Sequence, residues 1–444
     1  MTDPVPAGET RTDTVRIALL GAGTVGAEVA RVLLERPDEL AQRIGAHPEL
    51  IGIAVRDLEA ERTVELPRRL LTTDAEALID AADAVVELTG GIEPARTRIL
   101  RALAAGKPVV TGNKALLAQH GAELHAAAQA ADTTISYEAA VAGAIPIVRP
   151  VMESLSGDRI QRVLGIMNGT TNYILDQMDT TGASFDDALA EAQRLGFAEA
   201  DPTADVEGHD AASKVAILGG LAFHSSFTLD DVYCRGITGV TAEDIEAARS
   251  AGYVIKLLGV AERVADGVNL RVVPTMIPRS HPLAGVHGGY NAVFVEAEDA
   301  GELMFYGPGA GGAPTASAVL GDLVTAVRRK VLGGPAAGPT AHAGLPATGV
   351  DDVLTSFSLT ILCPDQTGVL AEVASVFAEH CVSISTMRQD DLPTDPQRPD
   401  RAMSQIRIRT HRARNADLVS TVEAVRGLDV VEELGGVIRV ETPA

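Results

Sequence analysis

The strongest constraint on the fold is the run GAGTVG at residues 21–26, which lies between a strand pattern and a helix pattern. The preceding VRIALL (15–20) is a continuous apolar run typical of a buried strand. The following residues place Val29 and Leu33 on one face of a helix. In that context G-x-G-x-x-G predicts a turn that binds the diphosphate of a dinucleotide. Without a ligand, the same run would still make a tight turn between strand and helix.

Each residue of this turn has an expected role. Gly21 permits the tight turn, Gly23 lets the backbone approach the diphosphate, and Gly26 allows the helix to pack closely on the strand. Thr24 and Val25 begin the helix, whose unpaired N–H groups and positive dipole end favour an anion. These five residues form the predicted cofactor-binding turn.

Short apolar runs alternate with helical patterns through the first 140 residues. The expected strands are 50–55, 84–88 and 108–112, and the expected helices are 93–105 and 114–131. This alternation predicts an α/β fold with a parallel sheet covered on both faces, a Rossmann-type NAD(P)-binding domain over residues 1–140.

The rhythm changes after about residue 140. Residues 141–315 are expected to form an α+β domain for substrate binding and dimerisation, with strands at 162–167, 270–277 and 292–298 and helices at 172–195, 209–223 and 241–252. The amphipathic helix 316–332 closes this region and is expected to complete the first domain. Residues 333–352 are rich in Gly, Pro and Ala and are predicted to be a linker. The order βαββαβ over 353–444 predicts a ferredoxin-like module.

Composition excludes several classes of partner. The net charge of -23 argues against nucleic acid and anionic membranes, because phosphate would be repelled. Three isolated cysteines (Cys234, Cys363 and Cys381) fit reduced thiols better than a disulfide framework or a zinc site. The polar N-terminus and the lack of a membrane-length apolar run predict a soluble, cytoplasmic protein.

The residues after the second strand bear on the choice of dinucleotide. Arg56 follows the strand directly, ahead of Asp57, and Arg62 is nearby. An arginine suits the 2′-phosphate of NADP, whereas an acidic residue suits the free 2′-hydroxyl of NAD. The order therefore favours NADP over NAD. Thr89 and Gly90 end a neighbouring strand and are expected to line the cofactor cleft, since ligands lie outside the carboxyl ends of parallel strands.

The stretch GFAEADPTADVEGHDAASKVAI (196–217) contains five carboxylates and one lysine. It does not match a calcium-binding loop. Counted from Asp201, the sixth position is Val206 and the twelfth is Ala212, where such a loop needs glycine and glutamate. No second His or Cys stands at helical spacing from His209, which disfavours zinc. Asp210 and Lys214, by contrast, lie at i, i+4 on one helical face.

Such a pair is often a solvent-exposed ion pair that contributes little. Carboxylates grouped around one lysine also suit a substrate that carries an ammonium and reacts at an oxygen. The carboxylates would hold the ammonium, while the lysine would protonate a developing alkoxide. Spacing alone leaves both interpretations open.

Several motifs together resemble the homoserine dehydrogenase family over residues 15–332. They are GAGTVG, GKPVVTGNKALLA (106–118), YEAAVAGAIPIVRP (137–150), GIMNGTTNYIL (165–175), the carboxylate-rich stretch and MFYGPGAGGAPTASAV (304–319). The resemblance implies NAD(P)-dependent interconversion of L-aspartate 4-semialdehyde and L-homoserine, in the biosynthesis of threonine, methionine and isoleucine.

The resemblance also implies roles for single residues. Lys214 corresponds to the general acid, with Asp210 beside it, and Glu199 and Asp210 correspond to substrate-binding carboxylates, with Asp205 near them. Lys114 corresponds to a lysine between cofactor and substrate, and so belongs to the implied catalytic, substrate and cofactor residues. Thr170 is implied to contact substrate, although a β-branched residue in a turn is often structural.

Further residues are assigned by the same resemblance. A monovalent cation, Na⁺ or K⁺, would be bound by Glu138 and the carbonyl groups of Val141, Gly143 and Ile145, which are oxygen ligands that suit a hard ion. Gly196 and Gly311 correspond to glycines near the nicotinamide. Without the resemblance, Gly311 belongs to a plain turn.

The C-terminal module separately resembles an ACT domain, through CPDQTGVLAEVASVFAEH at 363–380. In several homoserine dehydrogenases such a module binds an amino-acid effector, often threonine. ACT modules commonly pair across subunits, which suggests a homodimer or homotetramer.

Two other functions compete with this one. A semialdehyde dehydrogenase that forms an acyl intermediate would need a cysteine nucleophile. Cys234 is the only cysteine before residue 350 and lacks such a setting. The second alternative is a non-catalytic, NADP-bound amino-acid sensor, which would not turn over semialdehyde.

Overall fold

The computed structural model describes residues 14–62, 64–333, 341–392 and 402–441. These residues form two compact units, each built from more than one stretch of chain. The first unit comprises residues up to 157 together with 220–228 and 307–344. The second unit comprises 158–219, 229–306 and the residues from 345 onward.

The first unit is built on a six-stranded sheet in which every adjacent pair of strands is parallel. In sheet order the strands are β3 (Leu71–Thr72), β2 (His47–Ala54), β1 (Thr14–Leu20), β4 (Ala84–Glu87), β5 (Val109–Thr111) and β6 (Ile135–Ser136). The order 3-2-1-4-5-6 is that of doubly wound dinucleotide-binding folds. The predicted parallel sheet is confirmed.

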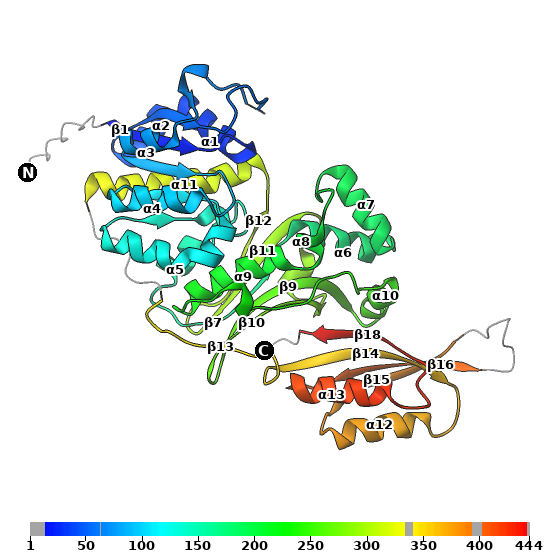
Figure 1. Cartoon of the computed structure of the whole chain (residues 1–444). Coiled ribbons are helices and arrows are strands. Elements are labelled where there is room, and N and C mark those ends of the chain that lie inside the picture. The colour runs from blue at the N-terminus through cyan, green and yellow to red at the C-terminus, as the bar shows by residue number, and fades with distance from the viewer. Residues whose placement is uncertain (1–13, 63, 334–340, 393–401, 442–444) are drawn as a thin grey trace, which may run out of the picture. The chain divides into compact units, whose positions relative to one another are not determined.

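Helices of the first unit cover this sheet (Figure 1). They are α1 (Thr24–Glu35), α2 (Pro37–Ile44), α3 (Ala75–Ala81), α4 (Ala95–Ala104), α5 (Lys114–Ala130) and α11 (Gly312–Leu332). The helices expected at 93–105 and 114–131 are confirmed, whereas α2 and α3 were not predicted. Both are short, and α2 follows α1 after a single residue, so no loop in the sequence separates the two patterns.

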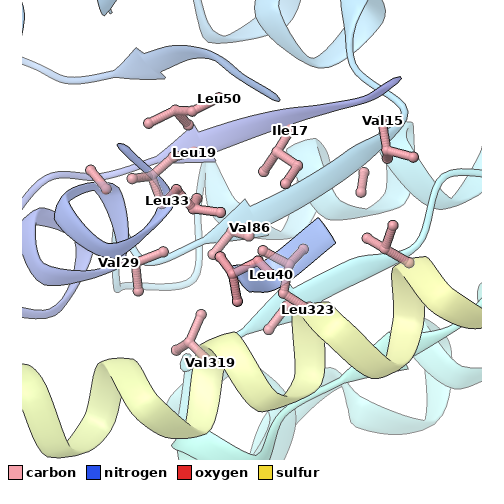
Figure 2. Packing of buried hydrophobic residues seen from close by; sticks show 14 of the residues in the cluster. Val15, Ile17, Leu19, Val29, Leu33, Leu40, Leu50, Val86, Val319 and Leu323 are labelled. Atoms are coloured by element: carbon pink, nitrogen blue, oxygen red, sulfur yellow. The ribbon is translucent and has the colours of Figure 1, made fainter. Parts of the chain in front are cut away.

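Helix α11 comes from the far end of the unit's sequence and packs on the same core as α1. Val319 and Leu323 on α11 lie with Val29 of α1 and Leu19 of β1, all almost completely buried (Figure 2). Burying one such aliphatic side chain stabilises the fold by about 1.5–3 kcal/mol. This helix is therefore part of the hydrophobic core of the first unit.

The second unit contains a mixed sheet of twelve strands, nine of which follow the order β12-β11-β7-β9-β10-β18-β14-β16-β15. Its first five strands are β12 (Gly301–Pro308), β11 (Tyr290–Ala297), β7 (Ile160–Ile166), β9 (Tyr253–Val264) and β10 (Gly267–Pro278), with the short β8 (Tyr233–Cys234) paired to β10. Strand β9 was not predicted. Val254 to Ala261 are all buried, so β9 lacks the alternation that marks a half-exposed strand.

Helices of this part are α6 (Gly169–Thr181), α7 (Phe185–Leu195), α8 (Thr203–Val206), α9 (His209–Ala222) and α10 (Ala242–Ser250). The single helix expected over 172–195 is wrong, because two helices occupy this range. Gly182 ends α6 in the left-handed region, with φ of 76°. The hydroxyl of Ser184 then accepts a hydrogen bond from Asp187 N and caps α7.

The C-terminal module has the predicted βαββαβ order. Its elements are β14 (Leu354–Pro364), α12 (Val369–Glu379), β15 (Ile384–Asp391), β16 (Met403–Thr410), α13 (Asn415–Arg426) and β18 (Glu433–Val440), with the two-residue strand β17 (Ala413–Arg414) in addition. Both helices lie on one face of the sheet (Figure 1) and share one core that includes Phe357, Val373 and Leu418. Residues 393–401, between β15 and β16, lie outside the described residues.

The module joins the rest of the second unit through its last strand. β18 pairs in parallel with β10, where Thr275 lies opposite Arg439 and Met276 opposite Val440. Directly after β18, Glu441 makes two hydrogen bonds of 2.7 Å with the guanidinium of Arg162 on β7. Within the predicted linker 333–352, Ala347–Thr348 form β13, which also pairs with β10, and residues 334–340 lie outside the described part.

Candidate active site

The predicted cofactor-binding turn has the close contacts that its glycines imply. Gly21 has φ of 97°, and a Cβ there would lie 2.6 Å from Leu88 O. A Cβ at Gly26 would lie 2.2 Å from Gly21 O, so the helix can approach the turn only without a side chain. A Cβ at Gly23 would meet nothing within 4 Å among the described residues, which leaves room for a ligand. No side chain caps α1, whose first residues Thr24 and Val25 keep their N–H groups for an anion.

Four side chains at the carboxyl ends of β4 and β5 form a hydrogen-bonded group. Glu87 is completely buried, and its carboxylate accepts from Thr89 N, Thr89 Oγ1 and Thr111 Oγ1 at 2.5–2.7 Å. Thr111 in turn accepts from Asn113 N, and Asn113 Nδ2 donates to Gly91 O. The group fixes Thr89 and the turn that contains Gly90, which has φ of 71°.

Sequence reasoning found Thr89 and Gly90 but missed Glu87, Thr111 and Asn113. A glutamate within a strand run gives no sign that hydroxyl groups on a neighbouring strand will bond it. Asn113 also caps α5 by accepting a hydrogen bond from Leu116 N. The next residue, Lys114, is exposed at the start of that helix.

The arginines after β2 differ in their contacts. The guanidinium of Arg62 donates to the carbonyl groups of Asp57 and Ala60 and so closes its own loop. Arg56 is exposed and makes no hydrogen bond in the described part of the chain. Of the two, Arg56 is the one whose guanidinium makes no hydrogen bond to the described residues.

Gly311 lies in the same unit, at the N-terminus of α11. Its φ is 122°, outside the range that a side chain accepts without strain. The following Gly312 is close to α1, because a Cβ there would lie 3.0 Å from Thr24 O. The start of α11 therefore reaches the cofactor-binding turn.

In the second unit, the predicted pair of Lys214 and Asp210 forms a buried ion pair on α9. Lys214 Nζ lies 2.6 Å from Asp210 Oδ2 and 2.6 Å from Met167 O, and both side chains are 9% exposed as residues. The exposed surface pair left open by the spacing is excluded by this burial. A buried ammonium with these two acceptors still has a third N–H to donate.

The neighbouring residues extend this pair into a polar cluster. Asn168 Nδ2 donates to Asp210 Oδ2 at 2.9 Å and to Asp205 Oδ1 at 2.6 Å. Thr170 Oγ1 donates to Phe197 O at 2.6 Å and lies 3.2 Å from Asp205 Oδ2. The cluster therefore brings Asp205 and Thr170 together with the lysine pair, as the sequence predicted, and adds Asn168, which sequence reasoning missed.

The other acidic residues of the carboxylate-rich stretch make no hydrogen bond to this cluster within the described part of the chain. Glu199 is exposed, and its carboxylate has no hydrogen bond or ion pair with the described residues. Asp201 Oδ1 accepts from Thr203 N and Oγ1, and Glu207 accepts from Thr238, so both have local structural roles. Gly196 ends α7 with φ of 80°.

The loop implied to bind a cation has a fully buried glutamate. The carboxylate of Glu138 accepts from Ile147 N, Val148 N and both Nε and N of Arg149, at 2.6–3.1 Å. Asp322 of α11 accepts from Glu138 N, and burial raises the pKa of Asp322 to about 7. The Glu138 carboxylate thus already has four protein donors.

The rest of that loop offers backbone oxygens. At Gly143 a Cβ would lie 2.3 Å from Gly309 O, so the loop packs tightly in the first unit. The carbonyl groups of Val141, Gly143 and Ile145 accept no backbone hydrogen bond within the described ranges. No group of three or more His, Cys, Asp or Glu side chains suited to a metal occurs in the described part of the chain.

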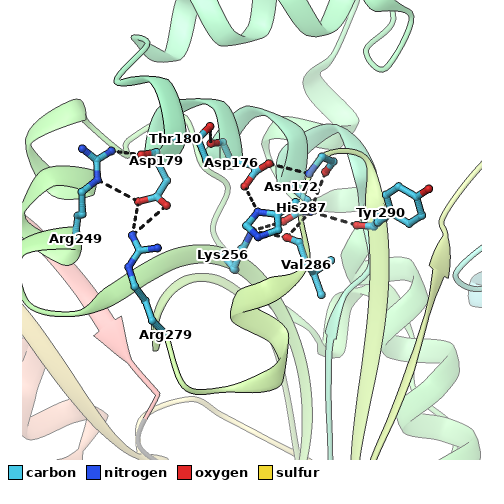
Figure 3. Close-up of polar contacts among 11 residues, drawn as sticks. Asn172, Asp176, Asp179, Thr180, Arg249, Lys256, Arg279, Val286, His287 and Tyr290 are labelled. Carbon is cyan, nitrogen blue, oxygen red and sulfur yellow. Dashed lines mark hydrogen bonds and ion pairs between the residues drawn. The ribbon is translucent and has the colours of Figure 1, made fainter.

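A second polar network lies around α6 and was not predicted (Figure 3). The Lys256 ammonium, 2% exposed, donates to Asn172 Oδ1 at 2.9 Å and to Val286 O at 2.7 Å. Asn172 Nδ2 and the Asp176 carboxylate bind the backbone of residues 286–290, the latter through Gly288 N. This network fixes the 286–290 loop against α6. In that loop, a Cβ on Gly289 would lie 2.5 Å from the ring of Phe197.

Cys234 has the environment of a structural thiol. Its Sγ donates to Glu207 O, and burial raises the pKa of the thiol to about 11. A thiol with that pKa stays protonated near neutral pH and is a poor nucleophile. The structure therefore disfavours the cysteine-dependent semialdehyde dehydrogenase.

The fold and the polar cluster define a class of protein. A doubly wound parallel sheet with a glycine-rich first turn is built to bind a dinucleotide, and a buried lysine paired with a carboxylate can move a proton at a carbonyl oxygen. Together they are the parts of an NAD(P)-dependent oxidoreductase. In the described part of the chain, no helix is long and apolar enough to cross a membrane.

Comparisons with known proteins agree with this class and narrow it. The family model for the NAD-binding domain of homoserine dehydrogenase matches residues 21–138, and the model for homoserine dehydrogenase matches residues 146–324. A homoserine dehydrogenase of Corynebacterium glutamicum is 54% identical over 96% of each chain, and one of Mycobacterium leprae is 52% identical over 96% of this chain and 98% of its own.

Solved structures of homoserine dehydrogenases are also similar to this chain. A homoserine dehydrogenase from Thiobacillus denitrificans has a TM-score of 0.89 and 40% identity, covering 97% of this chain and 98% of its own. A hyperthermophilic archaeal homoserine dehydrogenase in complex with NADPH has a TM-score of 0.60 and 28% identity, covering 73% of this chain and 100% of its own. The chain belongs to the homoserine dehydrogenase family.

Proposed function

We propose that the protein catalyses the reversible, NAD(P)H-dependent reduction of L-aspartate 4-semialdehyde to L-homoserine. Membership of the homoserine dehydrogenase family supports this reaction. The observation that carries the proposal within the chain is the buried Lys214 ammonium, which Asp210 Oδ2 and Met167 O hold at 2.6 Å each. Its third N–H can donate to the aldehyde oxygen of the substrate.

Lys214 is the proposed proton donor. When bound, the reduced nicotinamide supplies the hydride that reduces the aldehyde carbon. The electron pair of the C=O bond then moves to the oxygen, and Lys214 transfers its proton to that oxygen to give the alcohol. Asp210 keeps the ammonium oriented. We assign Lys114, at the exposed start of α5, a role in binding cofactor and substrate.

The substrate's ammonium group is the proposed ligand of the acidic residues. Asp205 is linked to the Lys214 cluster through Asn168, and its second oxygen lies 3.2 Å from the Thr170 hydroxyl. Thr170 therefore orients Asp205, which supports an indirect role in substrate binding. Glu199 is exposed and can turn toward a bound amino acid at little cost, since no described residue holds its carboxylate.

NADP is the proposed cofactor, with Arg56 as the ligand of the 2′-phosphate. Its exposed guanidinium supports this role, because Arg62 is already bonded to its own loop. The NADPH complex of the archaeal relative agrees with this choice. A comparison of kcat/KM with NADPH and NADH, for the unmodified protein and Arg56→Ala, tests it. Equal loss with both cofactors would refute a contact with the 2′-phosphate.

A monovalent cation is proposed for the loop of Val141, Gly143 and Ile145. Carbonyl oxygens suit Na⁺ or K⁺. The Glu138 carboxylate, with four donors of its own, would hold the loop in shape, and a cation there would stabilise this backbone. Activity measured in Na⁺, K⁺ and tetramethylammonium salts at one ionic strength tests the proposal, and identical rates would contradict it.

The C-terminal module is proposed to be an ACT domain that binds an amino acid, with threonine as the first candidate, in a homodimer or homotetramer. The βαββαβ order and the sheet order β18-β14-β16-β15 support this. Rates with and without millimolar threonine, and the mass of the particle in solution, test the two parts. An unchanged rate would contradict feedback by threonine, and a monomer would contradict the assembly.

Lys214→Met tests the central assignment. We expect kcat for semialdehyde reduction to fall by about 10²–10⁴-fold, the range for losing a general acid. NADPH affinity should be unchanged, because the dinucleotide turn belongs to the other unit. The exposed Lys330→Met is the matched control. An unchanged rate in Lys214→Met would refute the proton donor, and no turnover in any form would favour the amino-acid sensor.

A further inference from the structure

Asn168 lies at the turn between β7 and α6 and is 6% exposed. Its Nδ2 group donates to two different carboxylates, Asp205 Oδ1 at 2.6 Å and Asp210 Oδ2 at 2.9 Å. Its Oδ1 accepts from Thr171 N at 2.9 Å and caps α6. Both N–H groups and the carbonyl oxygen of this amide are therefore hydrogen-bonded.

The orientation of the amide follows from these partners. Turning it over would place Oδ1 against two carboxylate oxygens and Nδ2 against the Thr171 N–H, so that like groups would face each other at every contact. Only an amide offers two N–H donors on one side and an acceptor on the other. Aspartate has the same shape and caps a helix equally well, but it has no donor when ionised.

The same turn also holds the proposed proton donor. Met167, the residue before Asn168, accepts the second hydrogen bond of Lys214 through its carbonyl oxygen. The two adjacent residues therefore hold both members of the ion pair: Met167 binds the ammonium, and Asn168 binds the carboxylate oxygen to which that ammonium donates.

Asn168 also separates two like charges. Asp205 and Asp210 both accept from one amide nitrogen, and Lys214 is bonded to only one of them. Without a donor between them, the two carboxylates would repel each other, because a low-dielectric site screens charge poorly. They would then move apart or share a proton.

We propose that Asn168 is a positioning residue for the reaction: its amide holds Asp210 against Lys214 and Asp205 against Thr170. This inference rests on the proposed function. Asn168 aims the Lys214 N–H at the aldehyde oxygen through Asp210, and it fixes the carboxylate that receives the substrate's ammonium. It does not itself contact the reacting atoms.

Asn168→Asp and Asn168→Ser test the inference, because each keeps a helix-capping acceptor and removes the amide donor. We expect kcat/KM for semialdehyde to fall by at least tenfold in both, with a lower kcat and a higher KM. NADPH affinity and Tm should stay near those of the unmodified protein. In Asn168→Asp the added carboxylate should also move the basic limb of the kcat profile to higher pH, since a further negative charge stabilises the protonated lysine.

Asp74→Asn is the matched control. Asp74 caps α3 by accepting a hydrogen bond from Ala77 N. The variant replaces an acid with its amide at a capping position of the first unit, the reverse of Asn168→Asp. Its kinetics should not change. If both Asn168 variants keep kcat/KM within twofold and their pH profiles superimpose on that of the unmodified protein, the inference is wrong while the proposed function stands. If kcat/KM falls only in step with Tm, Asn168 is structural. An inactive unmodified protein would overturn both proposals.

Discussion

The buried Lys256 ammonium allows a prediction of stability against pH. Burial lowers its pKa to about 8 from the usual 10.5, although Asp176 and Asp179 oppose the shift, and Arg279 adds to it (Figure 3). The unfolded chain therefore binds more protons than the folded one between these two values. Stability contributed by this group rises with pH through that window.

The magnitude follows from the two pKa values. Between pH 7 and pH 9 the unfolded lysine stays protonated, whereas the folded one changes from largely charged to largely neutral. Each unit of pH in which only the unfolded state holds the proton contributes about 1.4 kcal/mol. Because the folded lysine is still partly charged through this range, the expected gain in unfolding free energy is about 1 kcal/mol.

Lys256→Met isolates this effect, since methionine fills a similar volume and does not titrate. The assay is urea unfolding followed by far-UV circular dichroism, because the chain has no tryptophan for fluorescence. We expect the unfolding free energy of the unmodified protein, minus that of Lys256→Met, to increase by about 1 kcal/mol from pH 7 to pH 9. Lys330→Met, at an exposed lysine, should show no such trend. Parallel curves for Lys256→Met and the unmodified protein would refute a lowered pKa at this site.

Three further predictions concern packing. Gly26→Ala places a Cβ 2.2 Å from Gly21 O, so the turn must shift, and NADPH affinity should fall by about tenfold or more, as an overpacking cost of about 1–3 kcal/mol implies. Leu323→Ala removes a fully buried side chain of α11 and should lower the unfolding free energy of the first unit by about 2–5 kcal/mol, measured in urea. Arg162→Met leaves Glu441 without its bidentate partner and should cost about 3–5 kcal/mol, seen as faster proteolysis of the C-terminal module.

Each of the three has a control within the chain. A Cβ at Gly157 would meet no atom within 4 Å in the described part, so Gly157→Ala should keep NADPH affinity. Leu332→Ala lies on the same helix as Leu323 but is 72% exposed. Arg159→Met breaks only an exposed pair with Glu298. Equal effects of a variant and its control would contradict the packing argument for that site.

Local patterns in the sequence were sufficient for most elements of the fold. Continuous apolar runs identified β1, β4 and β5, and GAGTVG identified the first turn, because a buried strand and a positive-φ glycine restrict the residues that can occupy them. The i, i+4 spacing of Asp210 and Lys214 likewise follows from the helix alone. Helices α6 and α7 were merged because the Gly182 stop and the Ser184 cap are only two residues apart.

The sequence by itself determined which residues face one another along a single helix or turn, since backbone geometry sets that spacing. Only the tertiary structure decided that the Lys214–Asp210 pair is buried, that Asn168 links Asp210 to Asp205, and that Glu199 is exposed. It also decided that Lys256 is buried and Cys234 partly buried, which lowers the pKa of the lysine and raises the pKa of the thiol. Burial and long-range hydrogen bonds depend on segments far apart in the chain, and no local pattern encodes them.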